Sequence, residues 1–393
     1  MGGGFSATHT PNTPEVRDFD LNEIIDGNQT SEVNMSASNQ RQSDVIVVGS
    51  GPGGATVAKE LAQKGKRVLL LERGQDYRSR GYYGTYLGAI RYSDRGSLLF
   101  TQEGLNIVRP LMVGGATSMY CGCAAPPPAW LKDRYGVDID LEVAETMDEL
   151  QIKPLPSELR GQASTRIARA AKALGYDWEP QLKFLKPARA ARFDCGAKCM
   201  LGCRCGAKWS AAEYVDQAVE AGCQLHTGAL VESVLIEDGT VRGVSGRIRG
   251  RPFKAQAETV VLAAGGIGTP RILHSTKVPG LQQAGQGMTM DITVMVYGTI
   301  QDRGIGKEPP MTWSWENLDE GYMLSTLIDP WLLYPLINAL KGPKYALTWP
   351  RWKNTLGIMI KLKDDISGGV FPNGKISNCL LYTSDAADEL RSV

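Results

Sequence analysis

The sequence predicts an α/β fold organised around parallel strands. A short apolar run at 44–48 is followed by a glycine-rich loop, a helical pattern of small and apolar residues, and a second apolar run at 67–71. This is the order of a βαβ unit, whose buried parallel strands read as continuous apolar runs. Alternating strands at 227–235 and 241–248 precede another apolar run that begins at 259. We therefore expect parallel strands together with an antiparallel meander.

Composition excludes several classes of partner. The 393 residues include 43 Lys and Arg against 42 Asp and Glu, so the net charge is +1 and no basic footprint for nucleic acid or an anionic surface exists. No apolar run approaches the ~18 residues of a membrane span, and the first residues lack a signal-peptide core. We expect a cytoplasmic protein with no membrane span. Residues 1–43, rich in Gly, Ser, Thr, Asn and Gln, predict a disordered leader.

The loop at 49–54 has the spacing Gly-x-Gly-x-x-Gly. The first glycine permits a tight turn, the second lets backbone amides approach a pyrophosphate, and the third lets the helix pack on the strand. The helix N-terminus offers free N–H groups to phosphates, and Glu72 ends the second strand, where an acid accepts hydrogen bonds from a ribose diol. This order predicts a dinucleotide site; the alternative is a glycine-rich turn of an ordinary α/β unit.

Two features favour FAD over NAD as the dinucleotide. Arg73 and Gly74 follow the acid at Glu72, as in many flavoproteins. Downstream, Asp238-Gly239 supplies a hairpin turn, a third strand lies near 253–257, and the apolar strand at 259–262 ends in small residues at 263–266. Small residues there let the backbone approach a cofactor.

Three blocks together resemble the glucose–methanol–choline (GMC) oxidoreductases, which are FAD-dependent enzymes that oxidise alcohols. They are 48–54 with 71–74, the Gly-Gly block at 113–118, and the block at 262–273. The resemblance covers roughly residues 44–377. It implies a two-dinucleotide-binding (Rossmann-like) FAD domain with an α+β substrate domain, and hydride transfer from the CH–OH group of an alcohol to the flavin, with electrons passing on to an acceptor.

The resemblance also implies roles at the cofactor. Glu72 would meet the adenosine ribose, the backbone of Val231 the adenine, and the Gly-Gly block the pyrophosphate and flavin. Ala264 and Gly265 would line the cofactor from the other side. The residues expected at the cofactor are Gly49, Ser50, Gly51, Pro52, Gly53, Gly54, Glu72, Arg73, Gly114, Gly115, Thr117, Val231, Ala264 and Gly265.

The sequence departs from the family after the second block, where Tyr120 and Cys121-Gly122-Cys123 replace a stretch that carries an Asn in many members. A second cysteine group follows, and Ser210 with Glu213 predicts the N-cap of a helix over 211–221. The group could bind an iron–sulfur cluster or zinc, but its spacing fits neither standard pattern. A disulfide or buried free thiols near Cys121 and Cys123 are the other interpretation. The group consists of Cys195, Cys199, Cys203 and Cys205.

Family members carry a catalytic histidine near the C-terminus, paired with a second His or an Asn, whereas the histidines here are His9, His226 and His274. We interpret each as structural, so the catalytic residues are unassigned. Strand patterns at 356–363 and 369–377 are followed by a tail that resembles adapter read-through. The sequence is therefore interpreted as truncated near residue 377.

The predicted domains are a leader (1–43), a discontinuous FAD domain (44–120 and 208–275), a Cys-containing insertion (121–207), a partial substrate domain (276–377) and a non-native tail (378–393). A helix is expected within 157–175. Five of the eight tryptophans fall in the substrate half, which suggests a bulky or apolar alcohol or else ordinary core aromatics. The alternative functions are another two-dinucleotide flavoprotein, such as a sterol or ketosteroid oxidoreductase, and an inactive FAD-binding fragment.

Overall fold

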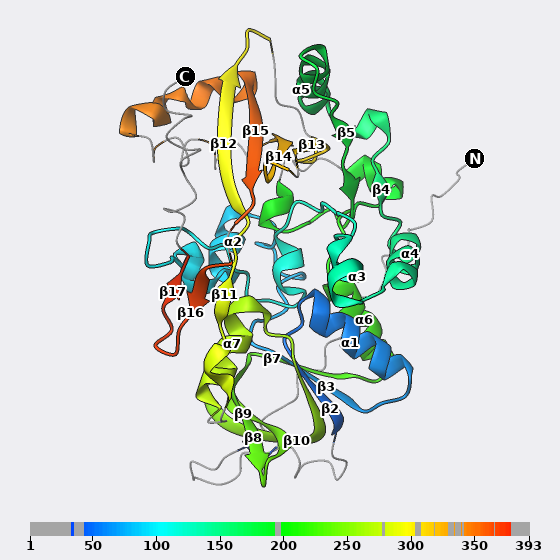
Figure 1. Cartoon of the computed structure of the whole chain (residues 1–393), viewed down its shortest axis with the longest axis vertical. Coiled ribbons are helices and arrows are strands. Elements are labelled where there is room, and N and C mark those ends of the chain that lie inside the picture. Colours follow the sequence, from blue (N-terminus) through cyan, green and yellow to red (C-terminus); the bar gives the residue numbers. More distant parts are fainter. Residues whose placement is uncertain are drawn as a thin grey trace, which may run out of the picture.

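The structure is a computed structural model and describes residues 33–34, 43–192, 198–276, 280–302, 308–317, 319–328, 334, 339, 342–364 and 366–378. Figure 1 shows two parts stacked along the long axis. The lower part holds the largest sheet with α1, α6 and α7, and the upper part holds a second sheet with α5. No helix of the described residues is long and apolar enough to cross a membrane.

The largest sheet has the strand order β7-β3-β2-β10-β9-β8. Its first four strands run parallel: β7 (Gln224–Thr227), β3 (Val68–Glu72), β2 (Ser43–Val48) and β10 (Arg251–Leu262). β8 (Ala229–Glu237) and β9 (Thr240–Ile248) pair antiparallel through the expected turn at 238–239. All five residues of β3 are buried, because strands inside a parallel sheet are covered on both faces. The predicted α/β class with its meander is confirmed.

One expectation about this sheet is wrong. The sequence predicted separate strands near 253–257 and from 259, but β10 is continuous. Its residues 251–256 pair with β9, and its residues 257–262 pair with β2. Glu258 interrupts the apolar pattern without ending the strand, because its side chain is exposed and its backbone stays extended. One strand therefore joins the meander to the parallel layer.

Three helices flank this sheet. α1 (Pro52–Gln63) packs beside α6 (Ala212–Glu220), and their small residues share a core with β2 and β3. α7 (Gly265–Ser275) contacts β8. The predicted cap of α6 is wrong, since Ala211 is the N-cap and no side chain caps it from that position. The backbone N–H of Ala211 donates instead to the Thr117 hydroxyl, at 2.9 Å.

The second sheet has the order β12-β15-β14-β13-β5. Its strands are β12 (Ile292–Thr299), β15 (Thr355–Leu362), β14 (Tyr322–Leu327), β13 (Trp313–Asn317) and β5 (Glu179–Pro180). α5 (Gln162–Ala173) contacts this sheet, so the segment 121–207 contributes both a strand and a helix to the upper part. The helix expected within 157–175 is thus present over a shorter range.

The remaining elements are small. β16 (Gly368–Val370) and β17 (Ile376–Ser377) form the hairpin expected at 369–377, and β11 (Gln286–Met288) extends it. The others are α2 (Tyr86–Tyr92), α3 (Trp130–Tyr135), α4 (Asp140–Glu149), β4 (Lys153–Pro154) and β6 (Leu182–Lys183).

Both chain ends lie mostly outside the described residues. Within the expected leader, β1 (Val33–Asn34) pairs with β10, and Ser43 begins β2. The rest of that expectation, and the tail from 379, fall on residues that the structure does not describe. Asn378 is buried and its backbone N–H donates to Glu103, at 3.0 Å.

Candidate dinucleotide site

The candidate site lies where the parallel strands end at their carboxyl termini. The N–H of Gly49 donates to the carbonyl of Leu71, at 2.8 Å, and the N–H of Ala263 donates to the carbonyl of Val48, at 2.8 Å. The loops after β2 and β10 therefore lie side by side. Ligands of open parallel sheets bind at such an edge. We call the segments 49–54, 114–115 and 263–266 the glycine-lined edge.

The glycines of the 49–54 loop fall into two groups according to the space that a side chain would have. A Cβ at Gly49, whose φ is +99°, would come within 2.5 Å of the Ala263 carbonyl oxygen, and one at Gly54 within 1.9 Å of the Gly49 oxygen. Gly51 and Gly53 face open space, with nothing within 4 Å. The outer glycines thus permit close backbone packing, and the central pair leaves room for a ligand.

Two helices begin at this edge without side-chain caps. α1 has Gly51 as N-cap, α7 has Ala264, and neither helix has an acidic residue in its first turn. Gly265 and Gly266, like Gly51 and Gly53, face open space. A helix N-terminus with unsatisfied N–H groups and partial positive charge attracts anions. The edge can therefore accept a phosphate-bearing molecule.

Glu72 is 7% exposed and is held beneath the loop. One carboxylate oxygen accepts from the Ser50 N–H at 2.9 Å and from its hydroxyl at 2.6 Å, and the other accepts from the Gly74 N–H at 2.7 Å. The second oxygen keeps a lone pair for a further donor. Glu72 thus orients the loop as well as ending β3, and Ser50, fully buried, is its partner.

The Gly-Gly block is packed directly against the first loop. Gly114 and Gly115 both have positive φ, and a Cβ at Gly115 would lie 2.8 Å from the Cα of Gly51. The Thr117 hydroxyl donates to the Gly114 carbonyl at 2.5 Å and accepts the Ala211 N–H. Thr117 therefore joins the Gly-Gly block to the start of α6. The sequence predicted a place at the cofactor for Thr117 but did not predict this contact with α6.

The other expected residues have distinct positions. Pro52 begins α1, where a missing N–H costs no hydrogen bond. Val231 is buried in β8, in a cluster that includes Leu71. Arg73 follows β3, and its charge helps to lower the pKa of Arg109.

Sequence reasoning missed a cationic group beside α7. Arg109 donates to Asp94 at 2.9 Å, and its guanidinium lies close to where a Cβ of Gly268 would stand, at 3.0 Å. Burial lowers the pKa of Arg109, and the charges of Arg73 and Arg271 act in the same direction while Asp94 opposes them. Arg109 thus pairs with Asp94 within the electrostatic reach of two further arginines. Arginines spread over 73–271 carry no shared motif, so only the fold reveals them.

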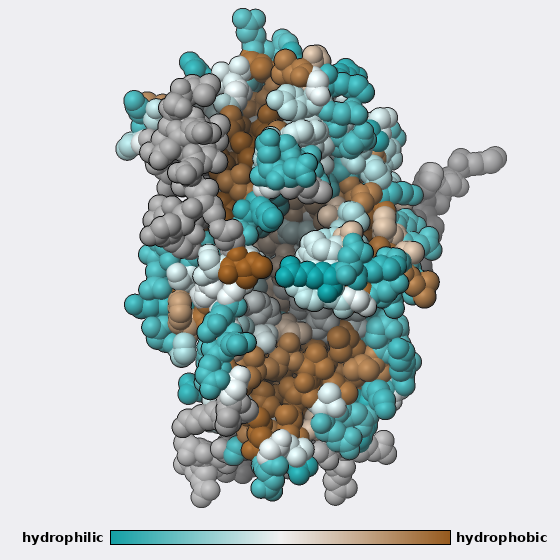
Figure 2. Space-filling view, in the orientation of Figure 1, coloured by the Kyte–Doolittle hydropathy of each residue, from teal (hydrophilic) through white to brown (hydrophobic). Residues whose placement is uncertain are grey.

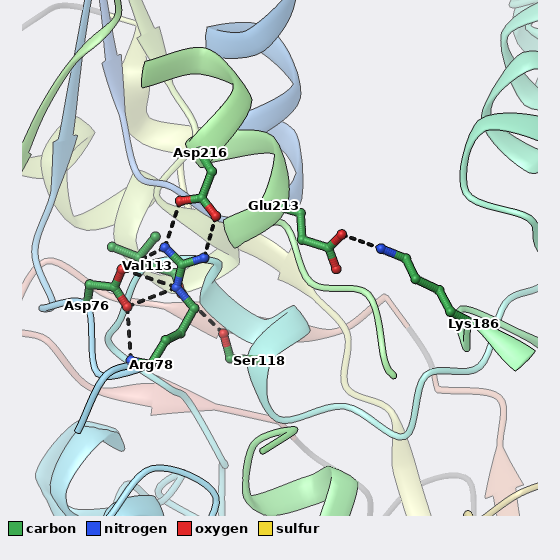
Figure 3. A network of polar contacts seen from close by, with 7 residues as sticks. All are labelled: Asp76, Arg78, Val113, Ser118, Lys186, Glu213 and Asp216. Carbon is green, nitrogen blue, oxygen red and sulfur yellow. Dashed lines mark hydrogen bonds and ion pairs between the residues drawn. The ribbon is translucent and has the colours of Figure 1, made fainter. Parts of the chain in front are cut away.

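A half-buried ion network fixes the segment after β3 to α6 (Figure 3). Arg78 donates to Asp76, at 2.6 Å, and to both carboxylate oxygens of Asp216, at 2.6 and 2.8 Å. Burial alone would lower the pKa of Arg78, but the hydrogen bonds to Asp216 and Asp76 outweigh it and raise that pKa. The hydroxyl of Ser118 donates nearby to the Val113 carbonyl, at 3.2 Å. The network therefore holds the segment after β3 against α6, and the Ser118 bond closes a turn within the neighbouring Gly-Gly block.

The cysteine group is described in part. Cys195 lies outside the described residues, whereas Cys199, Cys203 and Cys205 are thiols rather than halves of a disulfide. Over the described ranges, no three His, Cys, Asp or Glu side chains are grouped to hold a metal ion. Lys208 joins the two cysteine segments, since its ammonium donates to the carbonyls of Cys199 and Tyr120.

The described histidines have structural surroundings. His226 lies in β7 opposite Leu71, and burial lowers its pKa. The Nε2 atom of His274 lies 3.0 Å from the Val370 carbonyl and ties α7 to β16. His9 lies outside the described residues. The described structure thus assigns no catalytic histidine.

The two faces of the second sheet differ in chemistry. Trp313 and Trp315 pack against α5, so these two are core aromatics rather than a pocket lining. The opposite face is rich in methionine and contacts the segment that follows the Gly-Gly block. It comprises Met295, Met311, Met323, Leu327 and Met359, packed with Tyr297, Cys121 and Cys123. Methionine adapts to irregular apolar shapes.

The parallel unit, its glycine-lined edge and the meander define a protein of the Rossmann-like, dinucleotide-binding class. A family model described as GMC oxidoreductase matches residues 92–291, and one described as an NAD(P)-binding Rossmann-like domain matches residues 47–104. The chain belongs to the GMC oxidoreductase family, which confirms the resemblance seen in the sequence.

Individual relatives agree with this membership. A GMC-type oxidoreductase of Mycobacterium tuberculosis is 28% identical over 335 residues, covering 79% of this chain and 51% of the relative. A long-chain-alcohol oxidase of Arabidopsis thaliana is 26% identical, covering 66% of this chain and 37% of its own length. The chain spans about half the length of the first of these relatives and a smaller share of the length of the second. The fold is similar to that of pyridoxine 4-oxidase from Mesorbium loti, with a TM-score of 0.61 and 14% sequence identity. The similarity covers 89% of this chain and 78% of the oxidase chain.

Proposed function

We propose that the chain is the FAD-binding part of an oxidoreductase that acts on the CH–OH group of an alcohol. The observation that carries this proposal is the pair of uncapped helix N-termini, α1 and α7, which face open space at one sheet edge. A pyrophosphate needs such a place, since it brings negative charge and several acceptor oxygens. The proposal goes beyond the dinucleotide-binding class because the family and its alcohol-oxidising member favour a flavin.

The residues present fit a dinucleotide. The open space at Gly51 and Gly53 leaves room for the pyrophosphate, and Glu72 keeps a free lone pair for a ribose hydroxyl. Gly114 and Gly115 bring a second backbone segment against Gly51, where a side chain would intrude. Bound FAD supplies a hydride acceptor; the chain's part is to bind and orient it.

The rest of the expected cofactor shell remains part of this proposal. Val231 would approach the adenine through its backbone, Ala264 and Gly265 would line the opposite side, and Arg73 would add positive charge. The domain ranges 44–120 with 208–275 for FAD and 276–377 for substrate are proposed on the same grounds. An electron acceptor and a cytoplasmic location are likewise proposed from the sequence.

The methionine-rich face supports an apolar alcohol as the substrate class. It packs against Cys121 and Cys123, which follow the Gly-Gly block directly, so it is continuous with the cofactor side of the chain. The long-chain-alcohol oxidase among the relatives points in the same direction. No catalytic residue is assigned, because the described histidines are engaged elsewhere.

Flavin absorbance of the purified chain tests the proposal. We expect FAD to be bound and to be released on denaturation, and we expect its loss in Gly51→Val, whose Cβ would enter the open space. Gly81→Val is the matched control, since a Cβ at Gly81 also has open surroundings and the residue has an ordinary φ. A chain that never binds FAD when supplied with it would refute the proposal.

Anaerobic bleaching of the flavin tests the substrate class. Long-chain primary alcohols should bleach the flavin more readily than sugars do. A sterol is tested in parallel, because bleaching by the sterol alone would favour the alternative function of a sterol or ketosteroid oxidoreductase. Bound flavin that no alcohol bleaches would support an inactive FAD-binding fragment instead.

A further inference from the structure

Two buried lysines contact the cysteine segments: Lys183 contacts the segment at 121–123, and Lys208 lies between that segment and the one at 199–205. Lys183 is 0% exposed and Lys208 3% exposed. The Lys208 ammonium donates to the carbonyls of Ser118, Tyr120 and Cys199, at 3.0, 2.7 and 3.0 Å. The Lys183 ammonium donates to the Cys121 carbonyl at 2.8 Å and lies 3.2 Å from the Cys123 sulfur. The hydrogen bonds found for both ammonium groups in the described structure thus go to carbonyls and sulfur.

Buried positive charge of this kind favours a thiolate nearby. The Cys203 sulfur accepts the backbone N–H of Lys208 at 3.3 Å and lies 3.5 Å from the Cys205 sulfur. The hydrogen bond from Cys205 lowers the pKa of Cys203 to about 6, helped by the N–H and charge of Lys208 against the opposing effect of burial. The pKa of Cys205 is raised, first because it donates that hydrogen bond.

Two other described cysteines, Cys121 and Cys223, have a different environment. Burial raises the pKa of Cys121 and of Cys223 to about 12. Cys203 and Cys205 are half-buried and flank Arg204, whose side chain is exposed. A small reagent can therefore reach the pair, and only one intervening residue separates the two sulfurs.

We propose that Cys203 and Cys205 form a dithiol–disulfide redox site, with Cys203 as the nucleophile and a low-molecular-weight disulfide as the oxidant. The assignment stands on the 3.5 Å separation of the two sulfurs and on the backbone N–H of Lys208 that donates to the Cys203 sulfur, and the charge of Lys208 acts in the same direction. It does not depend on the proposed function. Lys208 links the pair to the end of the Gly-Gly block, because its backbone N–H donates to the Cys203 sulfur while its ammonium donates to the carbonyls of Ser118 and Tyr120.

The reaction has two exchanges. The Cys203 thiolate attacks one sulfur of the reagent, whose S–S bond breaks and releases one thiolate. Cys205 then loses its proton and attacks the Cys203 sulfur of the mixed disulfide, releasing the second thiolate. The protein dithiol is oxidised by two electrons and the reagent is reduced to two thiols. The sulfurs must approach from 3.5 Å to about 2 Å, which the turn at 204–206 has to absorb.

Peptide mapping of the oxidised full chain tests the site. Trypsin cleaves after Lys198, Arg204 and Lys208, so it places Cys203 and Cys205 on separate peptides, 199–204 and 205–208. After treatment with oxidised glutathione and blocking of free thiols, we expect these two peptides to be joined and to separate on reduction. Alkylation of the reduced chain at pH 7 should modify Cys203 at least tenfold faster than Cys223.

Cys199 shares a peptide with Cys203 and is the competing partner. Cys199→Ser should keep the 203–205 link, and Cys203→Ser should abolish it. A link that persists in Cys203→Ser, or a reduced wild-type chain in which neither thiol reacts faster than Cys223, overturns the proposal. Bound iron, acid-labile sulfide or zinc in the purified chain that protects these thiols from glutathione would also overturn it.

Discussion

The glycine-lined edge and the buried lysine–cysteine core, formed by Lys183, Lys208 and the cysteines around them, are built on opposite principles. At the edge, backbone segments approach closely because side chains are absent, as at Gly49, Gly54 and Gly115. In the core, long cationic side chains fill the interior and hold carbonyls together. The edge is therefore sensitive to any added atom, whereas the core is sensitive to the loss of a particular donor.

The largest effect is expected at the edge, for Gly54→Ala. Its Cβ would lie 1.9 Å from the Gly49 oxygen and 3.1 Å from the Cβ of Ala263, and neither neighbour is a flexible side chain that could move aside. We expect the free energy of unfolding to fall by more than about 3 kcal/mol, measured by denaturant unfolding. Gly53→Ala, one residue away in open space, should cost less than about 0.5 kcal/mol. Equal losses in the two variants would contradict the steric account.

In the core, Lys208→Met should cost about 2 to 3 kcal/mol, since three buried carbonyls lose their donor while a desolvated charge is removed. Denaturant unfolding of Lys64→Met provides the control, because Lys64 is exposed and should lose less than about 0.5 kcal/mol. A Lys208→Met chain as stable as wild type would show that the carbonyls find other donors.

A smaller effect is expected where the two regions meet at α6. Arg78→Lys keeps the charge but cannot bond Asp76 and Asp216 bidentately, which should cost about 1.5 kcal/mol. Arg67→Lys, at the more exposed pair with Asp44, should change stability by less than about 0.5 kcal/mol. Thermal unfolding of both variants would reveal whether burial sets the difference; similar shifts would argue that it does not.

The smallest effect concerns pH at the surface. The hydrogen bond from the Arg67 side chain lowers the pKa of Asp44 from 3.8 to about 2. Because the folded-state pKa lies below the unfolded value, the stabilisation is complete above pH 3.8 and disappears as the pH falls towards about 2. The melting temperatures of wild type and Asp44→Asn should therefore differ slightly at neutral pH and converge in acid. A difference that stays constant with pH would exclude this pair as its source.

Much of the fold was predictable, because the βαβ unit, the 238–239 hairpin and the strands at 356–363 and 369–377 carry local patterns. The errors came where residues far apart in the sequence decide where a helix or strand begins or ends. The helix at 211–221 starts one residue later than its Ser-x-x-Glu pattern indicated, since Thr117 takes up the free N–H. The strand break near 258 was wrong because β10 has different partners along its two halves.

Two strands of the largest sheet, β10 and β3, also differ in how far their apolar residues are buried. Figure 2 shows a broad hydrophobic area on the lower part, between the positions of α7 and α1 in Figure 1. The second half of β10 in this part stays half-buried at Val260, Val261 and Leu262, whereas β3 is wholly buried. Apolar runs of similar composition thus differ in burial according to their neighbours.

The sequence by itself determined the class of the protein and its family, because glycine spacing and strand patterns are local consequences of backbone sterics. It also identified the glycines and Glu72 of the candidate site. Only the tertiary structure decided that Arg109 pairs with Asp94 while the charges of Arg73 and Arg271 act on it, and that Lys208 joins Ser118 to Cys199. Burial and charge proximity depend on residues far apart in the chain, and no local pattern encodes them.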